Sequence, residues 1–199
     1  MSIVVRKAGS SDLPAAVSVL THAFSQDATT LGILGDPPRP EPMLRALFGA
    51  LATHDYSRPH GAIDVAVLDG RVVGAAMWAR PGRPGLTPAQ VARMFGALAP
   101  VLTWRLVPLI RHERLMASLR PTADHWYLFS VGVAEPGGGV GGLLLDAGLE
   151  RAGADPCYLE ASTSASARLY ARKGFEEIGR LPSPGDVELQ YAMWRPPQR

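Results

Sequence analysis

Hydrophobic residues along the chain follow two spacings, and their order predicts the order of helices and strands. Apolar positions over residues 13–24 recur at helical spacing, and Ser10 or Ser11 can cap the helix that this predicts. Residues 63–68 alternate instead, Asp69-Gly70 supplies a turn, and residues 71–79 return, which predicts a β-hairpin. The remaining pattern predicts strands over residues 3–6, 126–133, 157–161, 175–179 and 187–194, helices over residues 43–54, 88–98, 105–119, 143–152 and 166–173, and loops over residues 27–42 and 81–88.

This order of elements predicts a mixed sheet. The hairpin requires antiparallel neighbours, whereas the strand–helix–strand unit over residues 126–161 requires a parallel pair. We therefore expect an α/β (mixed α+β) fold with helices on both faces of a central sheet. Neither an internal repeat nor a composition break divides the chain, so residues 1–199 are expected to form a single domain.

Composition and charge narrow the possible functions. The chain has 199 residues, 47% of them hydrophobic and 19% charged, which suits a globular protein with a sizeable core. Its formal net charge of +2 is too small to indicate nucleic-acid binding. The longest apolar stretch, residues 96–110, contains two prolines and an arginine and is shorter than the ~20 residues that cross a bilayer. We therefore expect neither nucleic acid nor a membrane among its partners.

The cysteine and histidine content favours a reducing compartment and a site without metal. Cys157 is the single cysteine, so no intrachain disulfide forms and a multi-cysteine zinc site is excluded. We interpret Cys157 as a small buried residue rather than a nucleophile, because no histidine adjoins it in sequence. The first residues lack the layout of a signal peptide, and a cytoplasmic location is expected. Four histidines have no metal-ligand spacing and are interpreted as ordinary surface or core residues: His22, His54, His60 and His112.

A glycine-rich loop after the predicted strand over residues 126–133 carries the clearest chemical signal. It leads into the helix expected from residue 143, so bare backbone N–H groups lie at the positive end of a helix dipole. Glycines there let a ligand approach the backbone, because no Cβ blocks it. The loop is therefore a candidate site for a phosphate or pyrophosphate. Its candidate binding residues are Gly137, Gly138, Gly139, Val140, Gly141 and Gly142.

The same glycines satisfy the dinucleotide-binding pattern G-x-G-x-x-G, which is an alternative interpretation. Gly137, Gly139 and Gly142 occupy its glycine positions, and Glu160 ends the next strand, where a ribose-binding acid is expected. A Rossmann domain, however, needs several successive parallel repeats, and here the unit begins late and follows an antiparallel hairpin. A second alternative is a glycine-rich turn without a ligand, although so many glycines make a poor structural element unless something approaches them closely.

Several segments resemble one family in order and spacing. They are residues 6–12 with Ala23-Phe24 (first strand and helix), 63–78 (hairpin), 126–133 (fourth strand), Gly137-x-Gly139-x-Gly141 (acyl-CoA pyrophosphate loop), 158–162 (fifth strand), 169–175 (tyrosine helix and its turn) and 193–196 (closing strand). Over nearly its whole length the chain resembles the GCN5-related N-acetyltransferases (GNAT). Within that family it resembles the subgroup that includes puromycin N-acetyltransferase.

The resemblance implies a fold and a reaction. The fold is a mixed central sheet of about seven strands flanked by helices, whose fourth and fifth strands splay apart so that the pantetheine arm of an acyl-CoA fits between them. The reaction moves an acyl group, in the first place acetyl from acetyl-CoA, to the amine of a small molecule such as an antibiotic or a biosynthetic intermediate. No metal takes part, and a monomer or homodimer is expected.

The resemblance also assigns roles to residues. Backbone groups near Val131 and Val133 would bind the pantetheine amides, and Ser166 stands where the family usually has a cofactor-binding Asn. Tyr170 would be the acid that protonates the leaving thiolate, its alternative being a core tyrosine. Glu160 is the candidate base, acting directly or through water. For Glu160, a structural acid bonded to backbone or to an arginine is an equal alternative.

The glycine loop departs from the family pattern. Residues 133–141 are two fewer than usual, Pro136 stands where Gln or Arg is expected, and Gly138 stands where a basic residue is common. A charge-assisted phosphate contact contributes roughly 1.5–3 kcal/mol, so weaker CoA binding is expected. Replacement contacts could come from Arg80, Arg83, Arg168 or Arg172.

These departures leave two further hypotheses open. In one, the donor is an acyl or aminoacyl group on an acyl carrier protein in natural-product biosynthesis, and arginines before the fourth strand meet that acidic partner. In the other, the fold persists as a non-catalytic binding module, although retention of Tyr170 and Glu160 favours an active site still in use. The arginines are Arg105, Arg111, Arg114 and Arg120, for which a solvated helix face is the commoner explanation.

Overall fold

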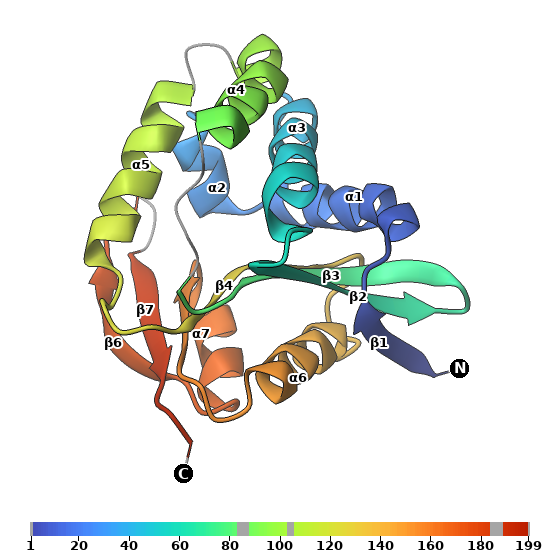
Figure 1. Ribbon diagram of the computed structural model, residues 1–199, viewed down its shortest axis with the longest axis vertical. Coiled ribbons are helices and arrows are strands. Elements are labelled where there is room, and N and C mark those ends of the chain that lie inside the picture. Colours follow the sequence, from blue (N-terminus) through green and yellow to red (C-terminus); the bar gives the residue numbers. More distant parts are fainter. Residues whose placement is uncertain (1, 83–87, 103–105, 184–188, 199) are drawn as a thin grey trace.

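One mixed sheet runs through the molecule. The computed structural model describes residues 2–82, 88–102, 106–183 and 189–198. Within them, seven strands lie in the order β1-β2-β3-β4-β5-β7-β6, with helices on both faces (Figure 1). The predicted α/β fold is therefore confirmed. The strands are β1 (Ile3–Lys7), β2 (Gly61–Leu68), β3 (Arg71–Ala79), β4 (Trp126–Val133), β5 (Cys157–Ala161), β6 (Glu176–Leu181) and β7 (Gln190–Arg195).

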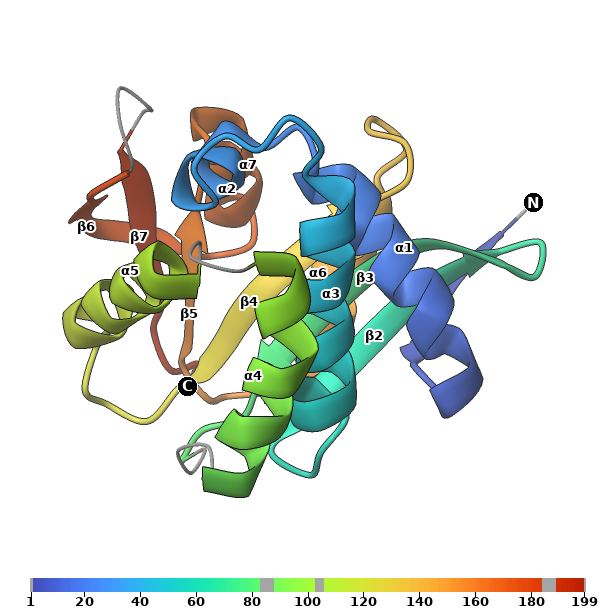
Figure 2. The ribbon, with the colours of Figure 1, turned by 90° about the horizontal axis from the view of Figure 1, so that it is seen from above.

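The helices form two layers of unequal size. Helices α1 and α3 lie over the face shown uppermost in Figure 1, and α4 and α5 continue that layer, as the view from above shows (Figure 2). Helix α6 packs on the opposite face against β2, β3 and β4. The helices are α1 (Leu13–Phe24), α2 (Ala28–Ile33), α3 (Glu41–Leu51), α4 (Pro88–Leu102), α5 (Leu106–Leu119), α6 (Val140–Ala152) and α7 (Ser164–Ala171), with a 3-10 turn at Ser10–Asp12 and a π-helical turn at Ala52–Tyr56.

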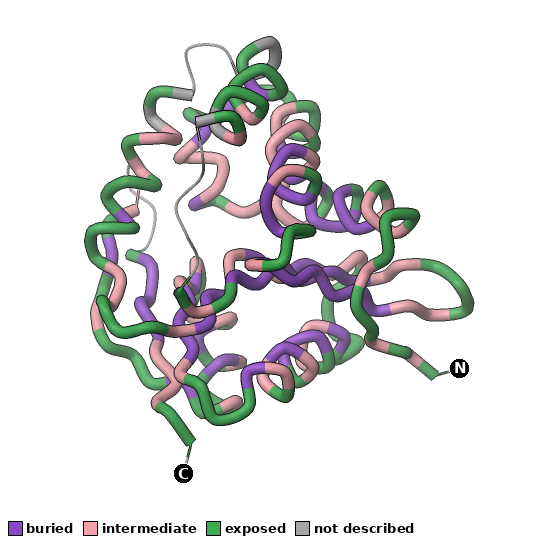
Figure 3. The backbone as a smooth tube through the Cα atoms, in the orientation of Figure 1, coloured by how far each residue is buried: buried purple, intermediate pink, exposed green. Residues whose placement is uncertain are grey.

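Alternation along the central strands divides the core into two parts. Successive side chains of a strand point to opposite faces, so Met77 of β3 packs on the side of Leu20 in α1, whereas Trp78 packs on the side of Leu144 in α6. Burial is continuous from Gly74 to Ala79 of β3 and from Trp126 to Leu128 of β4 (Figure 3). The central strands are therefore fixed from both sides and can hold a site at their ends.

The hairpin of β2 and β3 forms as predicted. Asp69 and Gly70 both have positive φ, 48° and 77°, which is the backbone that a two-residue hairpin turn requires. The antiparallel ladder runs from Gly61 opposite Ala79 to Leu68 opposite Arg71, with one irregularity between Ala66 and Val67.

The N-terminus of the first helix differs from the prediction. Residues 10–12 form a 3-10 turn, and neither serine caps α1. The carboxylate of Asp12 instead accepts the N–H of Gly9 at 2.7 Å and two guanidinium bonds from Arg6 at 2.6 and 2.8 Å. These bonds, from Arg6 first and then Gly9, lower the pKa of Asp12 to about 2. The Asp12 carboxylate therefore fixes the turn before α1 through Gly9 and Arg6, while α1 itself has no side-chain cap.

Other boundaries also differ from the prediction. The expected loop over residues 27–42 contains α2, because the Asp27 side chain caps it by accepting the N–H of Thr30 at 2.8 Å. Helix α4 continues past residue 98 and ends at Leu102. Helix α6 begins three residues earlier than expected, at Val140. Part of the predicted linker (residues 83–87), residue 105 and residues 187–188 of the predicted last strand lie outside the described residues.

We predict that Gly148→Ala destabilises the protein. A Cβ at Gly148 in α6 would overlap the indole ring of Trp78, which is buried against it. Overpacking of this kind lowers the free energy of unfolding by about 1–3 kcal/mol. Urea denaturation with a circular-dichroism readout measures the change.

The matched control for that change is Gly49→Ala in α3. A Cβ there meets nothing within 4 Å, and alanine is the better helix former by about 0.5–1 kcal/mol, so this variant should be more stable than the wild type. Equal effects of the two substitutions would contradict the packing argument.

Candidate active site

The sheet opens between β4 and β5. Their parallel pairing covers only Trp126 to Leu128 of β4 and Cys157 to Leu159 of β5. Beyond it β4 continues to Val133 and pairs only with β3 among the described strands. The predicted splaying of the fourth and fifth strands is confirmed, and it leaves one edge of β4 unpaired inside the protein.

The register of β3 and β4 decides which backbone groups face the opening. Ala134 N–H donates to Val73 C=O at 2.9 Å, and hydrogen-bonded and non-hydrogen-bonded pairs alternate along an antiparallel ladder. Gly132 is therefore bonded to β3, whereas Val131 and Val133 direct their N–H and C=O groups toward the gap. These are the two residues predicted to meet an extended ligand.

The glycine loop lies at the end of β4 and leads into α6. Gly139 is the N-cap residue with a φ of 72°, and the first helical bond runs from Leu143 N–H to Gly139 C=O at 3.2 Å. The N–H groups of Val140, Gly141 and Gly142 precede that bond and have no partner within the helix. A Cβ at Gly137, Gly139 or Gly142 would meet nothing within 4 Å. This open backbone cradle at a helix N-terminus fits a phosphate-bearing group.

A cavity of about 290 Å³ lies beside the opening. Apolar side chains such as Phe24, Phe48 and Leu109 form much of its wall, and β4 contributes residues 127–131. Several predicted residues converge on it although they are far apart in sequence: Val131, Glu160, Ser166 and Tyr170.

Tyr170 is a buried side chain at the cavity wall. It lies on α7, is 7% exposed, packs edge-on to Phe175 and lines the cavity. Burial and then the charge of Asp27 raise the pKa of its hydroxyl, so it stays protonated at neutral pH. Within the described residues the hydroxyl has no hydrogen-bond partner, which leaves its proton available to a group in the cavity.

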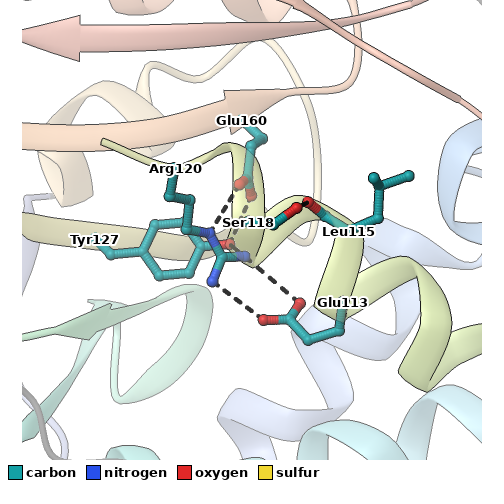
Figure 4. Close-up of polar contacts among 6 residues, drawn as sticks. All are labelled: Glu113, Leu115, Ser118, Arg120, Tyr127 and Glu160. Atoms are coloured by element: carbon teal, nitrogen blue, oxygen red, sulfur yellow. Dashed lines mark hydrogen bonds and ion pairs between the residues drawn. The ribbon is translucent and has the colours of Figure 1, made fainter. Parts of the chain in front are cut away.

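Glu160 is held in a charged cluster with side chains from α5, β4 and the residue after α5 (Figure 4). Arg120 Nε donates to Oε1 of Glu160 at 3.0 Å, and the Tyr127 hydroxyl donates to Oε2 at 2.6 Å. Arg120 also donates to the Tyr127 hydroxyl at 2.9 Å and to Glu113 at 3.1 Å, and its guanidinium lies 4.1 Å from the centre of the Tyr127 ring. We name Glu113, Arg120, Tyr127 and Glu160 the charged cluster.

The charged cluster has consequences for protonation and for the role of Glu160. Burial alone lowers the pKa of Arg120, but Tyr127, Glu160 and Glu113 together outweigh it and raise that pKa. Burial and the charge of Glu160 raise the pKa of Tyr127, so its hydroxyl remains a donor. Both oxygens of Glu160 are occupied, which is the arrangement of the structural acid bonded to an arginine.

Other predicted residues have local partners. Ser166 and Thr163 form a reciprocal cap of α7, in which Ser166 N–H donates to Thr163 Oγ1 at 3.1 Å. Cys157 is fully buried, and burial raises the pKa of its thiol to about 11, so it packs as a small core residue. Arg80 stacks on Trp126 at the far end of β4 from the glycine loop. Arg168 and Arg172 on and after α7 are exposed, and Arg83 lies outside the described residues.

The charged cluster also bears on the arginines expected to meet a carrier protein. Arg120 is only 17% exposed and is committed to Glu113 and Glu160. Arg111 and Arg114 are exposed on α5, and Arg105 lies outside the described residues. The basic surface before β4 is therefore smaller than the sequence suggested.

The sequence predicts that the segment over residues 86–119 helps to build an acceptor pocket, but it does not single out the residues of α5 that line the cavity. Leu109, His112, Glu113 and Met116 line the cavity, and their i, i+3, i+4, i+7 spacing places them on one face. This spacing is visible in the sequence, but it does not reveal which partner the face packs against. His112 was interpreted as an ordinary histidine, whereas it lies at the cavity wall with Tyr170 and Glu160.

The described residues contain neither a candidate membrane-spanning helix nor a candidate metal cluster. No helix among them is both long and apolar enough to cross a membrane. In the same residues no group of three or more His, Cys, Asp or Glu side chains could hold a metal ion.

Comparison with solved structures shows that the whole chain resembles acetyltransferases. A protein of Corynebacterium glutamicum described as histone acetyltransferase HPA2 and related acetyltransferase is 36% identical, with a TM-score of 0.76, over 100% of this chain and 98% of that one. A mosquito arylalkylamine N-acetyltransferase-like protein (16% identity, TM-score 0.63) and a Drosophila melanogaster polyamine N-acetyltransferase (18%, 0.57) each match 97% of this chain and 99% of their own, and share its fold. No protein-family model and no curated protein sequence matches the chain.

The chain therefore belongs to the GNAT acetyltransferases, whose members use acetyl-CoA. Identity of 36% over the full length of both chains is enough to show the family. The narrower puromycin-like subgroup stays a prediction.

We predict that Arg120→Met destabilises the protein because it leaves Glu160 buried without its cation. The Glu160 side chain is 11% exposed. Removing one partner of a buried ion pair lowers the free energy of unfolding by about 3–5 kcal/mol. The loss should be smaller here, because Arg120 is partly solvated. Chemical denaturation is the measurement, and a loss above about 1.5 kcal/mol is expected.

Glu113→Gln is the control for that variant. Glu113 is 53% exposed on the same guanidinium, and pairs of that kind contribute at most about 1 kcal/mol. If Arg120→Met were no worse than Glu113→Gln, the charged cluster would not be a stabilising element.

Proposed function

We propose that this protein is an N-acetyltransferase that moves an acetyl group from acetyl-CoA to the amine of a small molecule, with Tyr170 as the acid for the leaving thiolate. The observation that carries the proposal is the buried, protonated Tyr170 at a cavity beside the opening of β4 and β5. Residues 1–199 would act as one catalytic domain. The cytoplasmic location and the monomeric or dimeric state stay predictions.

The donor fits the residues that are present. The glycine cradle, Gly137 to Gly142, has room for the pyrophosphate, because three of its glycines have open space where a Cβ would lie. Val131 and Val133 would bind the pantetheine amides through the backbone groups that face the gap. Ser166 would add a hydroxyl at the cavity wall. The thioester, when bound there, supplies an activated acyl carbon.

The acceptor would occupy the cavity. Its apolar wall suits a carbon skeleton, and the carboxylates of Glu113 and Glu160 suit a positively charged amine. Related folds support small amines as substrates, since two of the similar structures are described as polyamine and arylalkylamine N-acetyltransferases. An antibiotic or a biosynthetic intermediate remains the expected kind of acceptor.

For Glu160 we propose a positioning role in place of the general-base role that the family resemblance implies. Because its two oxygens are bonded to Arg120 and Tyr127, we propose that it positions the charged cluster at the cavity wall. A carrier-protein donor is not favoured by any particular contact, since Arg120, one of the arginines that would meet it, is committed inside the protein.

Tyr170→Phe tests the acid. Loss of a general acid lowers the rate by about 10²–10⁴-fold, whereas the affinity for CoA should stay within a few-fold because the ring is retained. The assay follows thiol release from acetyl-CoA with agmatine, spermidine and tyramine as trial acceptors, and calorimetry measures CoA binding. Tyr191→Phe on β7, outside the cavity, is the control. Unchanged kcat in Tyr170→Phe would refute the assignment.

Gly142→Ala tests the donor site. A Cβ at Gly142 meets nothing within 4 Å and alanine is the better helix former, so the fold should be at least as stable as before, but the methyl group would enter the space proposed for the phosphates. CoA binding should weaken by about tenfold or more, since close approach to the backbone is lost. Gly49→Ala, far from the loop in sequence, should bind CoA normally. Equal CoA affinity in wild type and Gly142→Ala would place the phosphates elsewhere.

A further inference from the structure

The proposed reaction needs a base, and the charged cluster does not offer one. A primary aliphatic amine is an ammonium ion at neutral pH and must lose a proton before its nitrogen can attack a thioester. Glu160 accepts bonds from Arg120 and Tyr127 on its two oxygens. Glu113 is bonded to the same guanidinium. A base must therefore come from another side chain that reaches the cavity.

His112 is a side chain at the cavity wall outside the charged cluster. It lies on the face of α5 that lines the cavity, one turn from Leu109 and Met116, and it is half-buried. Tyr170 lines the same cavity from α7. Within the described residues, the imidazole of His112 has no hydrogen-bond partner, so a ring nitrogen is available to a molecule in the cavity.

The surroundings of His112 keep it neutral. Burial lowers the pKa of the imidazole below its ordinary value, Glu113 and Glu160 oppose that effect, and Arg120 adds to it. A neutral imidazole at pH 7 has a lone pair free to accept a proton. The titratable or charged groups that share the cavity wall with it are Asp27 before α2, Glu113 on its own helix, Tyr127 on β4, Glu160 on β5 and Tyr170 on α7, with Arg120 bonded across them.

We propose that His112 is the catalytic base that takes a proton from the ammonium group of the acceptor. This inference rests on the proposed acetyltransferase function. One proton passes from nitrogen to the imidazole, and the freed lone pair of the amine bonds to the acyl carbon. The carbon–sulfur bond breaks with its electron pair on sulfur, which takes the proton of Tyr170. The second amine proton returns to the Tyr170 oxygen, and His112 releases its proton to solvent.

His112→Gln tests the base while keeping a polar side chain of similar size. With the trial amine that the wild type acetylates best, kcat/KM at pH 7 should fall by about 10²–10⁴-fold, the usual contribution of a general base. The activity of the variant should climb steadily toward pH 10, because solvent then deprotonates the amine without the imidazole. His22→Gln, an exposed histidine on α1 outside the cavity, should match the wild type throughout.

The titration of His112 in the wild type gives a second test that needs no variant. The acid limb of kcat/KM should coincide with the ring titration of His112 followed by NMR, and both should lie below pH 6.5. A mismatch between the two curves would overturn the inference, as would an unchanged acid limb in His112→Gln. Absence of acetyl transfer by the wild type to every trial amine would instead remove the proposed function and this inference with it.

Discussion

The parting of β4 and β5 is the constraint on which the rest of the structure depends. Pairing ends at Leu128 and Leu159, yet β4 continues with its backbone groups directed into the gap. Buried N–H and C=O groups without partners are costly, so this edge must be met by water or by an extended ligand. The glycine cradle after Val133 and the cavity beside β5 both lie at this opening. A long donor such as acyl-CoA can therefore contact the cradle with its pyrophosphate and the cavity with its thioester.

The charged cluster holds the opening together from the side of α5. Arg120 follows that helix and bonds to Glu160 of β5, while its guanidinium lies over the ring of Tyr127 on β4. The guanidinium of Arg120 therefore connects the end of α5 to β4, the next strand in the chain, and to β5, which is distant in sequence. It also occupies the carboxylate that would otherwise be the obvious base, which shifts the expected chemistry toward His112 on the same helix face.

Much of the fold could be predicted because local patterns dictate it. The Asp69-Gly70 turn and the alternation around it specify the hairpin, and the glycine run after β4 marks a helix N-terminus. The exact start of α6 was missed because Gly141 and Gly142 are poor helix formers, whereas both lie inside the helix, which begins at the buried Val140. The partners of Glu160 and the position of His112 could not be predicted, since they depend on where α5 packs. Spacing on one helix carries no information about that packing.

Amide hydrogen exchange at Val131 and Val133 tests whether the open edge of β4 binds the pantetheine arm of the donor. In the free protein, the N–H groups of these two residues face the gap, whereas the Ala134 N–H is bonded to Val73. Adding CoA should slow amide exchange at Val131 and Val133 and leave exchange at Ala134 unchanged, because the pantetheine arm then pairs with the open edge of β4. Binding of CoA with no added protection at either valine would contradict it.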